Sequence, residues 1–167
     1  MLIAAGAAVV VFGAMIAEAR LAARNDRALR AAGAREPRDD VFRWMQIAYP
    51  ACFAAMCAEG AWRSVALDGA FAAGVSIFAL AKLLKYWAIA SLGPRWTFRV
   101  LVPPGSERTR RGPYRWLAHP NYVGVAGELM GAAVAMHALV TGPAAVTVFC
   151  ILMIRRVAVE EKALAAE

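Results

Sequence analysis

The feature that most constrains the fold of this chain is its division into long apolar runs separated by arginine-rich connections. Apolar residues make up 61% of the sequence, whereas soluble domains contain about 45–50%. A run of about 20 apolar residues can cross the hydrocarbon core of a bilayer as a helix. The pattern predicts an all-α fold, a polytopic transmembrane helical bundle with about five spans. The predicted spans are Leu2–Ala19, Met45–Trp62, Val65–Leu92, Tyr122–Val140 and Ala144–Ile154.

The basic residues are concentrated in three of the polar segments. Arg20–Arg43 contains seven, Gly93–Pro120 six and Arg155–Glu167 three of the 19 lysines and arginines. With five spans, these segments face the same side of the membrane, which the positive-inside rule makes cytoplasmic. We expect a multi-pass integral membrane protein with its N-terminus outside and its C-terminus in the cytoplasm. The membrane would be the bacterial inner membrane or the endoplasmic reticulum, according to the source.

The first apolar run could also be a signal peptide, because Ala17-Glu18-Ala19 resembles a small-residue cleavage site. A signal peptide carries positive charge before its apolar stretch. No lysine or arginine precedes the stretch here, so we expect a retained span.

The net charge of +7 does not by itself indicate a nucleic-acid partner. The basic residues lie between apolar runs, where they orient membrane proteins, and we expect no nucleic-acid binding. Cys52, Cys57 and Cys150 lie inside apolar runs and form no CxxC pair or Cys/His cluster. We expect them to pack as small apolar residues, and we predict no metal site.

The last third of the chain carries four short motifs in a fixed order. They are Leu92-Gly93-x-x-Trp96-Thr97, Gly112-Pro113-Tyr114-Arg115, His119-Pro120-Asn121-Tyr122-x-Gly124 and Arg156-x-x-x-Glu160-Glu161-x-x-Leu164. Together they resemble the isoprenylcysteine carboxyl methyltransferase family of membrane enzymes. The resemblance implies S-adenosylmethionine as methyl donor, bound on the cytoplasmic side. It also implies a lipophilic acceptor that enters from the membrane, either the carboxylate of a prenylated cysteine or, as in bacterial relatives, a phenolic lipid.

The resemblance divides the chain, which we predict to be a single membrane domain, 1–167. Residues 1–91 would form the first three spans and their connections. Residues 92–167 would form the methyltransferase-like region, in which the Pro-rich loop (Gly93–Pro120) and the C-terminal helical tail (Arg155–Glu167) build the cofactor site. The sequence leaves the oligomeric state open.

The candidates for this site are residues of these motifs, together with Glu128 of the fourth predicted span. Catalytic roles are expected for Arg156, Glu160 and Glu128. Cofactor contacts are expected for Tyr114, His119, Pro120, Tyr122, Gly124, Glu160 and Glu161. The family usually has an arginine before the His-Pro pair, where this chain has Ala118. That difference puts any role of the arginine in doubt here, and Arg115 is a possible substitute.

Each candidate also has a structural interpretation. His119 could be an interfacial histidine, and the tyrosines could belong to the aromatic belt at the membrane surface. Gly127, Gly131 and Ala135 have the spacing of close helix packing, although they could also give clearance to a cofactor. Arg156 and Glu160 are four residues apart, which is the spacing of an ordinary surface ion pair. Glu128 is a costly carboxylate within a predicted span and is therefore a functional candidate.

The acceptor decides whether the reaction needs a base. A carboxylate acceptor needs none, whereas a phenol is mostly protonated near neutral pH and would be helped by one. Glu128, His119 and Glu160 are the candidates, and the sequence does not rank them. Three other functions remain open: an NADPH-dependent membrane sterol or lipid reductase, a phospholipid N-methyltransferase, and a non-catalytic membrane protein.

Overall fold

The structure, a computed structural model, describes residues 1–37, 40–103 and 109–165. The described residues are mainly helical and form no extended sheet; they confirm the predicted all-α bundle. The elements are α1 (Leu2–Ala31), α2 (Phe42–Trp62), α3 (Gly69–Leu92), the short 3-10 turns η1 (Gly93–Arg95) and η2 (Gly112–Arg115), α4 (Pro120–Ala135) and α5 (Thr141–Ala165).

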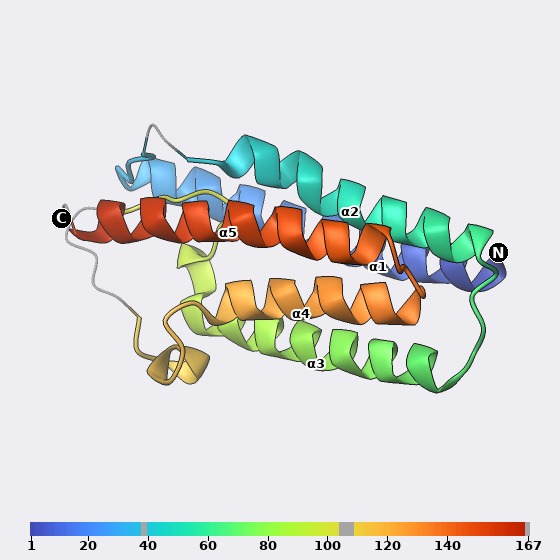
Figure 1. Ribbon diagram of the computed structural model, residues 1–167. Coiled ribbons are helices and arrows are strands. Elements are labelled where there is room, and N and C mark those ends of the chain that lie inside the picture. The colour runs from blue at the N-terminus through green and yellow to red at the C-terminus, as the bar shows by residue number, and fades with distance from the viewer. Residues whose placement is uncertain (38–39, 104–108, 166–167) are drawn as a thin grey trace.

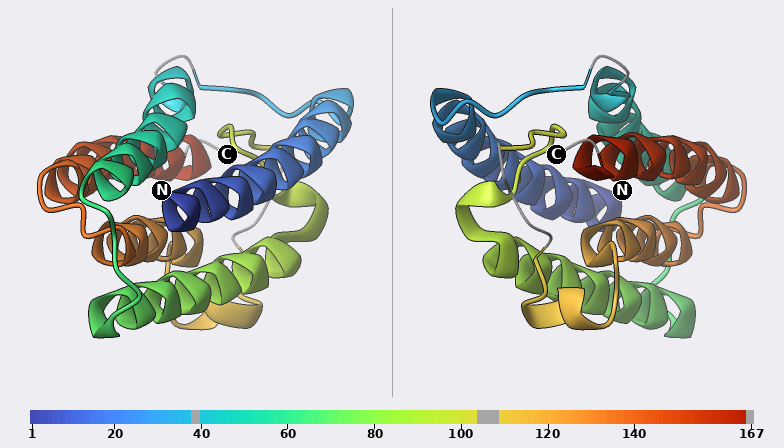
Figure 2. Two further views of the ribbon diagram at one scale, coloured as in Figure 1. Left: turned by 90° about the vertical axis from the view of Figure 1, so that its right-hand side faces the viewer. Right: turned by 90° about the vertical axis from the view of Figure 1, so that its left-hand side faces the viewer.

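The helices run alternately up and down, so the chain ends at the opposite end of the bundle from where it begins (Figure 1). In cross-section α4 lies between α3 and α5, α5 packs beside α2, and α2 packs beside α1 (Figure 2). This order brings the α1–α2 connection, the α3–α4 connection and the C-terminal part of α5 to one end. We call it the basic end, since these are the three arginine-rich segments.

The first helix is longer than the apolar run that predicted it. The first run was expected to end at Ala19, with a polar connection from Arg20 onward, but α1 continues to Ala31. Alanine, leucine and arginine, which dominate this extension, are among the best helix formers. Ala22, Asn25 and Leu29 are buried on one face of it, so packing holds the extension in place.

The fourth run, by contrast, gives a shorter helix than predicted. α4 ends at Ala135, and His137 has a positive φ of 49° that breaks the helix. Glu59 of α2 explains why a turn forms here. Its carboxylate accepts hydrogen bonds from the Thr141 backbone N–H at 2.7 Å and the Val140 N–H at 3.2 Å, so it satisfies free donors at the start of α5.

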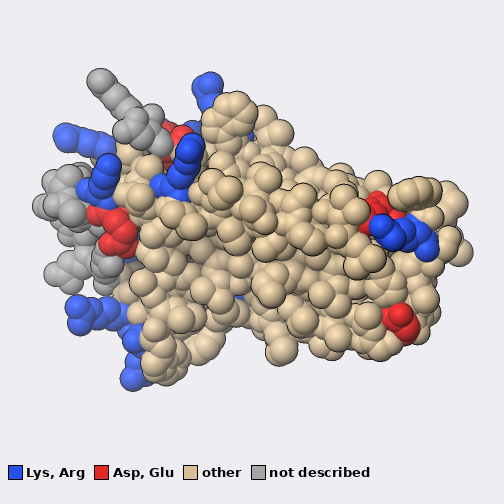
Figure 3. Space-filling view, in the orientation of Figure 1, with Lys and Arg blue, Asp and Glu red and all other residues tan. Residues whose placement is uncertain are grey.

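Three helices in the described part of the chain are long and apolar enough to cross a membrane: α1, α3 and α5. α4 has 16 residues and is about 24 Å long at about 1.5 Å per residue, so a full crossing by α4, as by α2, stays a prediction. On the face shown in Figure 3, charged side chains gather at the two ends, and the middle is covered almost entirely by uncharged residues. This distribution is that of a membrane-embedded bundle.

The glycines of α4 provide the close helix packing that their spacing predicted. A Cβ at Gly131 would lie 2.5 Å from the backbone nitrogen of Phe78 in α3, and one at Gly74 would lie 2.2 Å from the backbone nitrogen of Ala135. Since the backbones of α3 and α4 touch at these points, no larger side chain fits. The three cysteines likewise pack against the apolar core as half-buried residues, as predicted.

Candidate functional site

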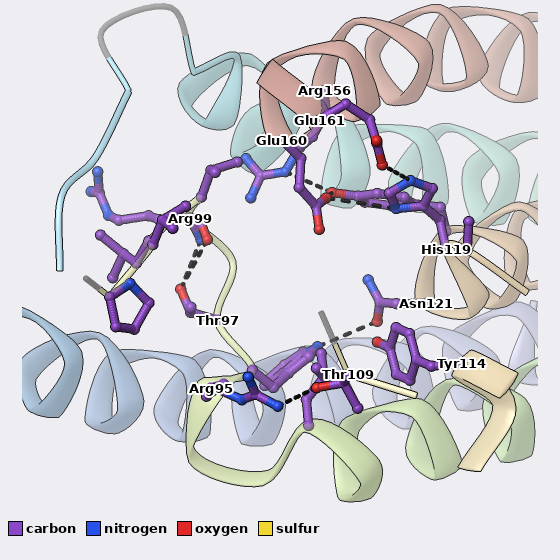
Figure 4. A pocket seen from close by; sticks show the side chains of 18 of the residues that line it. Arg95, Thr97, Arg99, Thr109, Tyr114, His119, Asn121, Arg156, Glu160 and Glu161 are labelled. Atoms are coloured by element: carbon purple, nitrogen blue, oxygen red, sulfur yellow. Dashed lines mark hydrogen bonds and ion pairs between the residues drawn. The ribbon is translucent and has the colours of Figure 1, made fainter. Parts of the chain in front are cut away.

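A cavity of about 350 Å³ lies at the basic end, between the α3–α4 connection and the C-terminal part of α5 (Figure 4). Its wall combines aromatic, basic and acidic side chains. The residues that line it are Leu92, Arg95, Trp96, Thr97, Arg99, Val100, Leu101, Val102, Pro103, Thr109, Arg110, Tyr114, Ala118, His119, Asn121, Tyr122, Arg156, Glu160 and Glu161. Its volume falls in the range of roughly 300–1,000 Å³ typical of small-molecule sites.

The segment after α3 forms one wall of the cavity and is anchored to α1. Asn25 of α1 is buried, and its amide donates hydrogen bonds to the carbonyls of Trp96 at 2.8 Å and Gly93 at 3.4 Å. The indole of Trp96 in turn donates to Asn121 at 3.4 Å. The extension of α1 beyond the apolar run therefore positions the wall of the cavity.

His119 and Pro120 lie where the α3–α4 connection enters α4. Pro120 is the first residue of the helix, where its missing N–H is tolerated, and His119 is the residue before it. The Nε2 of His119 lies 3.0 Å from Oε1 of Glu161, and its Nδ1 lies 3.8 Å from Oε2 of Glu160. The imidazole therefore joins the start of α4 to the two acidic residues of α5.

Arg156 and Glu160 share one face of α5, as their spacing predicted, but they are joined through a third residue. The hydroxyl of Tyr122 donates to Glu160 at 2.8 Å and accepts from Nε of Arg156 at 3.1 Å. The guanidinium is buried, whereas the side chains of Glu160 and Glu161 are 32% and 40% exposed. The two carboxylates can therefore reach a ligand, and Figure 4 shows Glu160 pointing into the cavity.

Tyr114 faces these acidic residues from η2 (Figure 4). Burial raises the pKa of its hydroxyl, and the nearby negative charge of Glu160 raises that pKa further. The phenol therefore stays protonated at neutral pH and can act as a hydrogen-bond donor in the cavity. Its ring gives the wall an apolar face on which a flat ligand can stack.

Glu128 lies away from the cavity, inside the bundle. Its carboxylate is 2.9 Å from Nζ of Lys82 and 3.4 Å from Nζ of Lys85, and it accepts a hydrogen bond from Tyr49 of α2. Lys82 and Lys85 also bind Glu18 of α1, at 3.0 and 2.6 Å. We call Glu18, Lys82, Lys85 and Glu128 the ionic quartet. The structure places Glu128 in the ion pairs of this quartet and not beside the cavity.

The side chains of the two lysines point into the bundle, with Lys82 only 14% and Lys85 only 3% exposed. The carboxylates of α1 and α4 explain this orientation, since a buried ammonium needs a paired anion.

Two other candidates pack against neighbouring helices. A Cβ at Gly124 would lie 2.9 Å from the Cβ of Lys85 and 3.1 Å from the carbonyl oxygen of Ala81. The absence of a side chain at Gly124 therefore allows α3 to pack closely against α4. Pro120 is buried and is the first residue of α4. Ala118, at the position where the family usually has an arginine, lines the cavity. Arg115, the substitute considered above, is not among the lining residues, and its guanidinium lies 5.4 Å from the ring centre of Trp116.

Sequence reasoning missed several residues of the site. Asn121 and Thr97 line the cavity, and their presence inside the quoted motifs was a usable signal. Arg95 and Arg99 are in the Pro-rich loop, where their positive charge was attributed only to membrane orientation. Asp40 belongs to the α1–α2 connection, and its Oδ1 lies 2.5 Å from Nη1 of Arg156. No sequence motif marks this residue.

The fold and the cavity define a helical membrane protein with a small-molecule site of mixed charge at its basic end. The model of the isoprenylcysteine carboxyl methyltransferase (ICMT) family matches residues 74–166, more than half of the chain. The chain belongs to this family. The match begins within α3, ahead of residue 92, where we predicted that the methyltransferase-like region of this single domain begins.

Two relatives come from bacteria. The uncharacterized protein YpbQ of Bacillus subtilis (strain 168) is 37% identical over 83 residues, which are 50% of this chain and 49% of that protein. An uncharacterized protein of Haemophilus influenzae (strain ATCC 51907 / DSM 11121 / KW20 / Rd) is 23% identical over 142 residues, 84% of this chain and 83% of that protein. The chain thus aligns with about half of YpbQ. No solved structure matches.

Proposed function

We propose that this protein is an S-adenosylmethionine-dependent methyltransferase that methylates an oxygen of a lipophilic acceptor at the membrane. The oxygen would be a carboxylate or a phenolic hydroxyl, and the acceptor a small molecule or a prenylated cysteine. The observation that carries the proposal is the grouping of His119, Tyr122, Glu160 and Glu161 around one cavity, in a chain of a methyltransferase family.

The side chains of the cavity fit the chemistry of this cofactor. Glu160 and Glu161 offer carboxylates to an ammonium group or to ribose hydroxyls. Tyr114 and Tyr122 offer aromatic faces, which attract a cationic sulfonium or stack on adenine. Arg95 and Arg110 add positive charge to the same wall, which suits the carboxylate of an amino acid.

S-adenosylmethionine, when bound, supplies an activated methyl group, and the chain has to align the acceptor with it and exclude water. A carboxylate acceptor is already an anion and would need no proton transfer. A phenolic acceptor must lose its proton. His119 is the base we assign to that role, because it lines the cavity and Glu161 holds its imidazole at 3.0 Å.

We place the basic end on the cytoplasmic side. Its three arginine-rich segments support this by the positive-inside rule, and soluble cofactors are available there. A C-terminal tag should then be reached by an added protease only after the membrane is permeabilised; digestion in intact cells would contradict the assignment.

The test is calorimetric titration of the full chain in detergent with S-adenosylmethionine and, separately, with NADPH. We expect binding of S-adenosylmethionine alone. His119→Ala and Glu160→Gln should weaken it about tenfold or more, as expected for loss of a hydrogen bond to a charged group. His137→Ala and Asp68→Asn are matched controls at the opposite end of the bundle and should leave the affinity unchanged.

Other outcomes would contradict the proposal. NADPH binding in place of S-adenosylmethionine would indicate a reductase. Equal affinity in His119→Ala and wild type would remove this cavity as the binding site. A tritiated methyl group that the purified protein passes to lipid amines, but to no carboxylate or phenol, would indicate an N-methyltransferase.

A further inference from the structure

The α1–α2 connection lies along the wall of the cavity although it is outside the region that matches the family. Arg35 and Val102 exchange two backbone hydrogen bonds of 3.1 Å each. Glu36 lies 2.7 Å from Nη1 of Arg99. This connection is therefore attached to the segment that follows η1, and Asp40, two residues before α2, is brought close to α5.

Asp40 is the residue that makes this approach. Its side chain is only 4% exposed. It accepts hydrogen bonds from the backbone N–H of Phe42 at 3.0 Å and of Val100 at 3.1 Å, and from Nη1 of Arg156 at 2.5 Å. These three donors hold the carboxylate in one fixed orientation. Its position is therefore set by the backbone at the start of α2 and by the backbone of the segment after η1.

Arg156 is held at all three of its nitrogens. Nη1 donates to Asp40, Nη2 donates to the carbonyl of Phe98, and Nε donates to the hydroxyl of Tyr122 at 3.1 Å. Tyr122 in turn donates to Glu160 at 2.8 Å. The contacts form a continuous path from Asp40 through Arg156 and Tyr122 to the carboxylate that faces the cavity.

We infer that Asp40 is a positioning residue of the methyl-donor site and acts through Arg156; this inference rests on the function proposed above. Asp40 pairs with the positive charge of Arg156 and directs Nε toward Tyr122. Glu160 then keeps its negative charge for a cationic group of the ligand. Without Asp40, the buried guanidinium loses its counterion, and the nearest carboxylate on its own helix face is Glu160, four residues on. Their pairing would neutralise the group that the ligand needs.

The first experiment is a double-mutant cycle on the affinity for S-adenosylmethionine, measured by calorimetry with the full chain in detergent. Asp40→Asn keeps the size of the side chain and removes its charge. It should lower the affinity about tenfold to a hundredfold, as expected for a hydrogen bond between charged groups. In the Arg156→Ala background, Asp40→Asn should cause no further loss. Asp68→Asn is the control, since Asp68 also accepts a backbone N–H but lies at the opposite end.

The second experiment needs no ligand. 3-Fluorotyrosine at position 122 reports the surroundings of the hydroxyl by its fluorine NMR shift. Asp40→Asn and Arg156→Ala should move the resonance, whereas Asp68→Asn should not. Unfolding curves from tryptophan fluorescence identify variants that have lost the fold; Asp40→Glu, which keeps the charge, should bind the donor better than Asp40→Asn.

The two experiments separate this inference from the proposed function. If wild-type protein binds no S-adenosylmethionine, the proposed function fails, and the fluorine shift still decides whether Asp40 orients Arg156 against Tyr122. An unmoved resonance in folded Asp40→Asn would overturn the inference. The inference would also be overturned if Asp40→Asn lowered the affinity for S-adenosylmethionine as much in the Arg156→Ala background as in the wild-type protein.

Discussion

Replacing Glu18 with glutamine should destabilise the bundle far more than the loss of any ion pair at its surface. Glu18 lies in α1 and its side chain is 4% exposed. It lies 2.6 Å from Lys85 and 3.0 Å from Lys82, the two cations of α3. The ionic quartet contains two lysines and two glutamates, so its formal charge is zero. Glu18→Gln leaves one positive charge without a partner inside the bundle.

The expected size of the effect follows from burial. Removing one partner of a buried ion pair costs roughly 3–5 kcal/mol, because the remaining charge stays buried and unpaired. Glu36 provides the comparison: its side chain is 23% exposed and pairs with Arg30 and Arg99 at the basic end. A pair at the surface contributes about 0–1 kcal/mol. Glu18→Gln should therefore be several times more damaging than Glu36→Gln.

Thermal unfolding in detergent, followed by tryptophan fluorescence, measures the difference. For a chain of this length about 1 kcal/mol shifts Tm by roughly 2–4 °C, so Glu18→Gln should lower Tm by roughly 6–20 °C. The double variant Glu18→Leu/Lys85→Leu leaves Lys82 with Glu128 and restores a neutral cluster. It should recover most of the loss, since apolar replacement of a whole buried pair is often neutral or stabilising.

Two results would refute this reasoning about charge. One is a Tm for Glu18→Gln no lower than that of Glu36→Gln. The other is a double variant that unfolds as early as Glu18→Gln itself, which would mean that the missing contacts, and not the uncompensated charge, destabilise the protein.

Two further predictions concern packing and pH, and the same unfolding assay checks both. Gly131→Ala should cost about 1–3 kcal/mol through overpacking, because its Cβ would lie 2.5 Å from backbone of α3, whereas Gly13→Ala should not lower Tm, because nothing lies within 4 Å of its Cβ. Asp68 accepts the N–H of Phe71 and pairs with His137, and these contacts lower its pKa below 3.8. Its contribution to stability is therefore present above pH 3.8 and is lost as the pH falls through the lower folded-state pKa. In Asp68→Asn that part of the acid dependence should disappear, and an unchanged Tm profile at acid pH would contradict the assignment.

The sequence predicted the helices better than their ends. Long apolar runs indicate a membrane helix directly, since a bilayer allows few other structures. The ends depend on contacts that no run reveals. α1 continues through several arginines because Asn25 binds the turn after α3, from 68 and 71 residues away along the chain. α4 stops early because Glu59, on α2, caps the next helix.

The candidate site was predictable where the motif is local. His119, Tyr122, Glu160 and Glu161 follow from two short motifs, and the structure brings them to one cavity. Glu128 was a candidate because a carboxylate within a membrane helix is costly, and that cost can be met by a lysine, as here, as well as by a ligand. The sequence does not show which, since Lys85 and Glu128 are 43 residues apart and meet only when α3 and α4 pack.

The first two helices contribute more than a hydrophobic anchor. The region that matches the family begins in α3, yet two of its buried cationic groups have counterions from outside that region. Glu18 of α1 pairs with the lysines of α3, and Asp40 pairs with Arg156 of α5. A buried charge without its partner is strongly unfavourable, so the matched region alone would contain unpaired lysine and arginine side chains. A chain that begins at α3 should therefore fail to fold in detergent unless α1 and α2 are supplied with it. Recovery of the fold on co-expression of the two pieces would show that these contacts, and not the covalent connection, are what α3–α5 require.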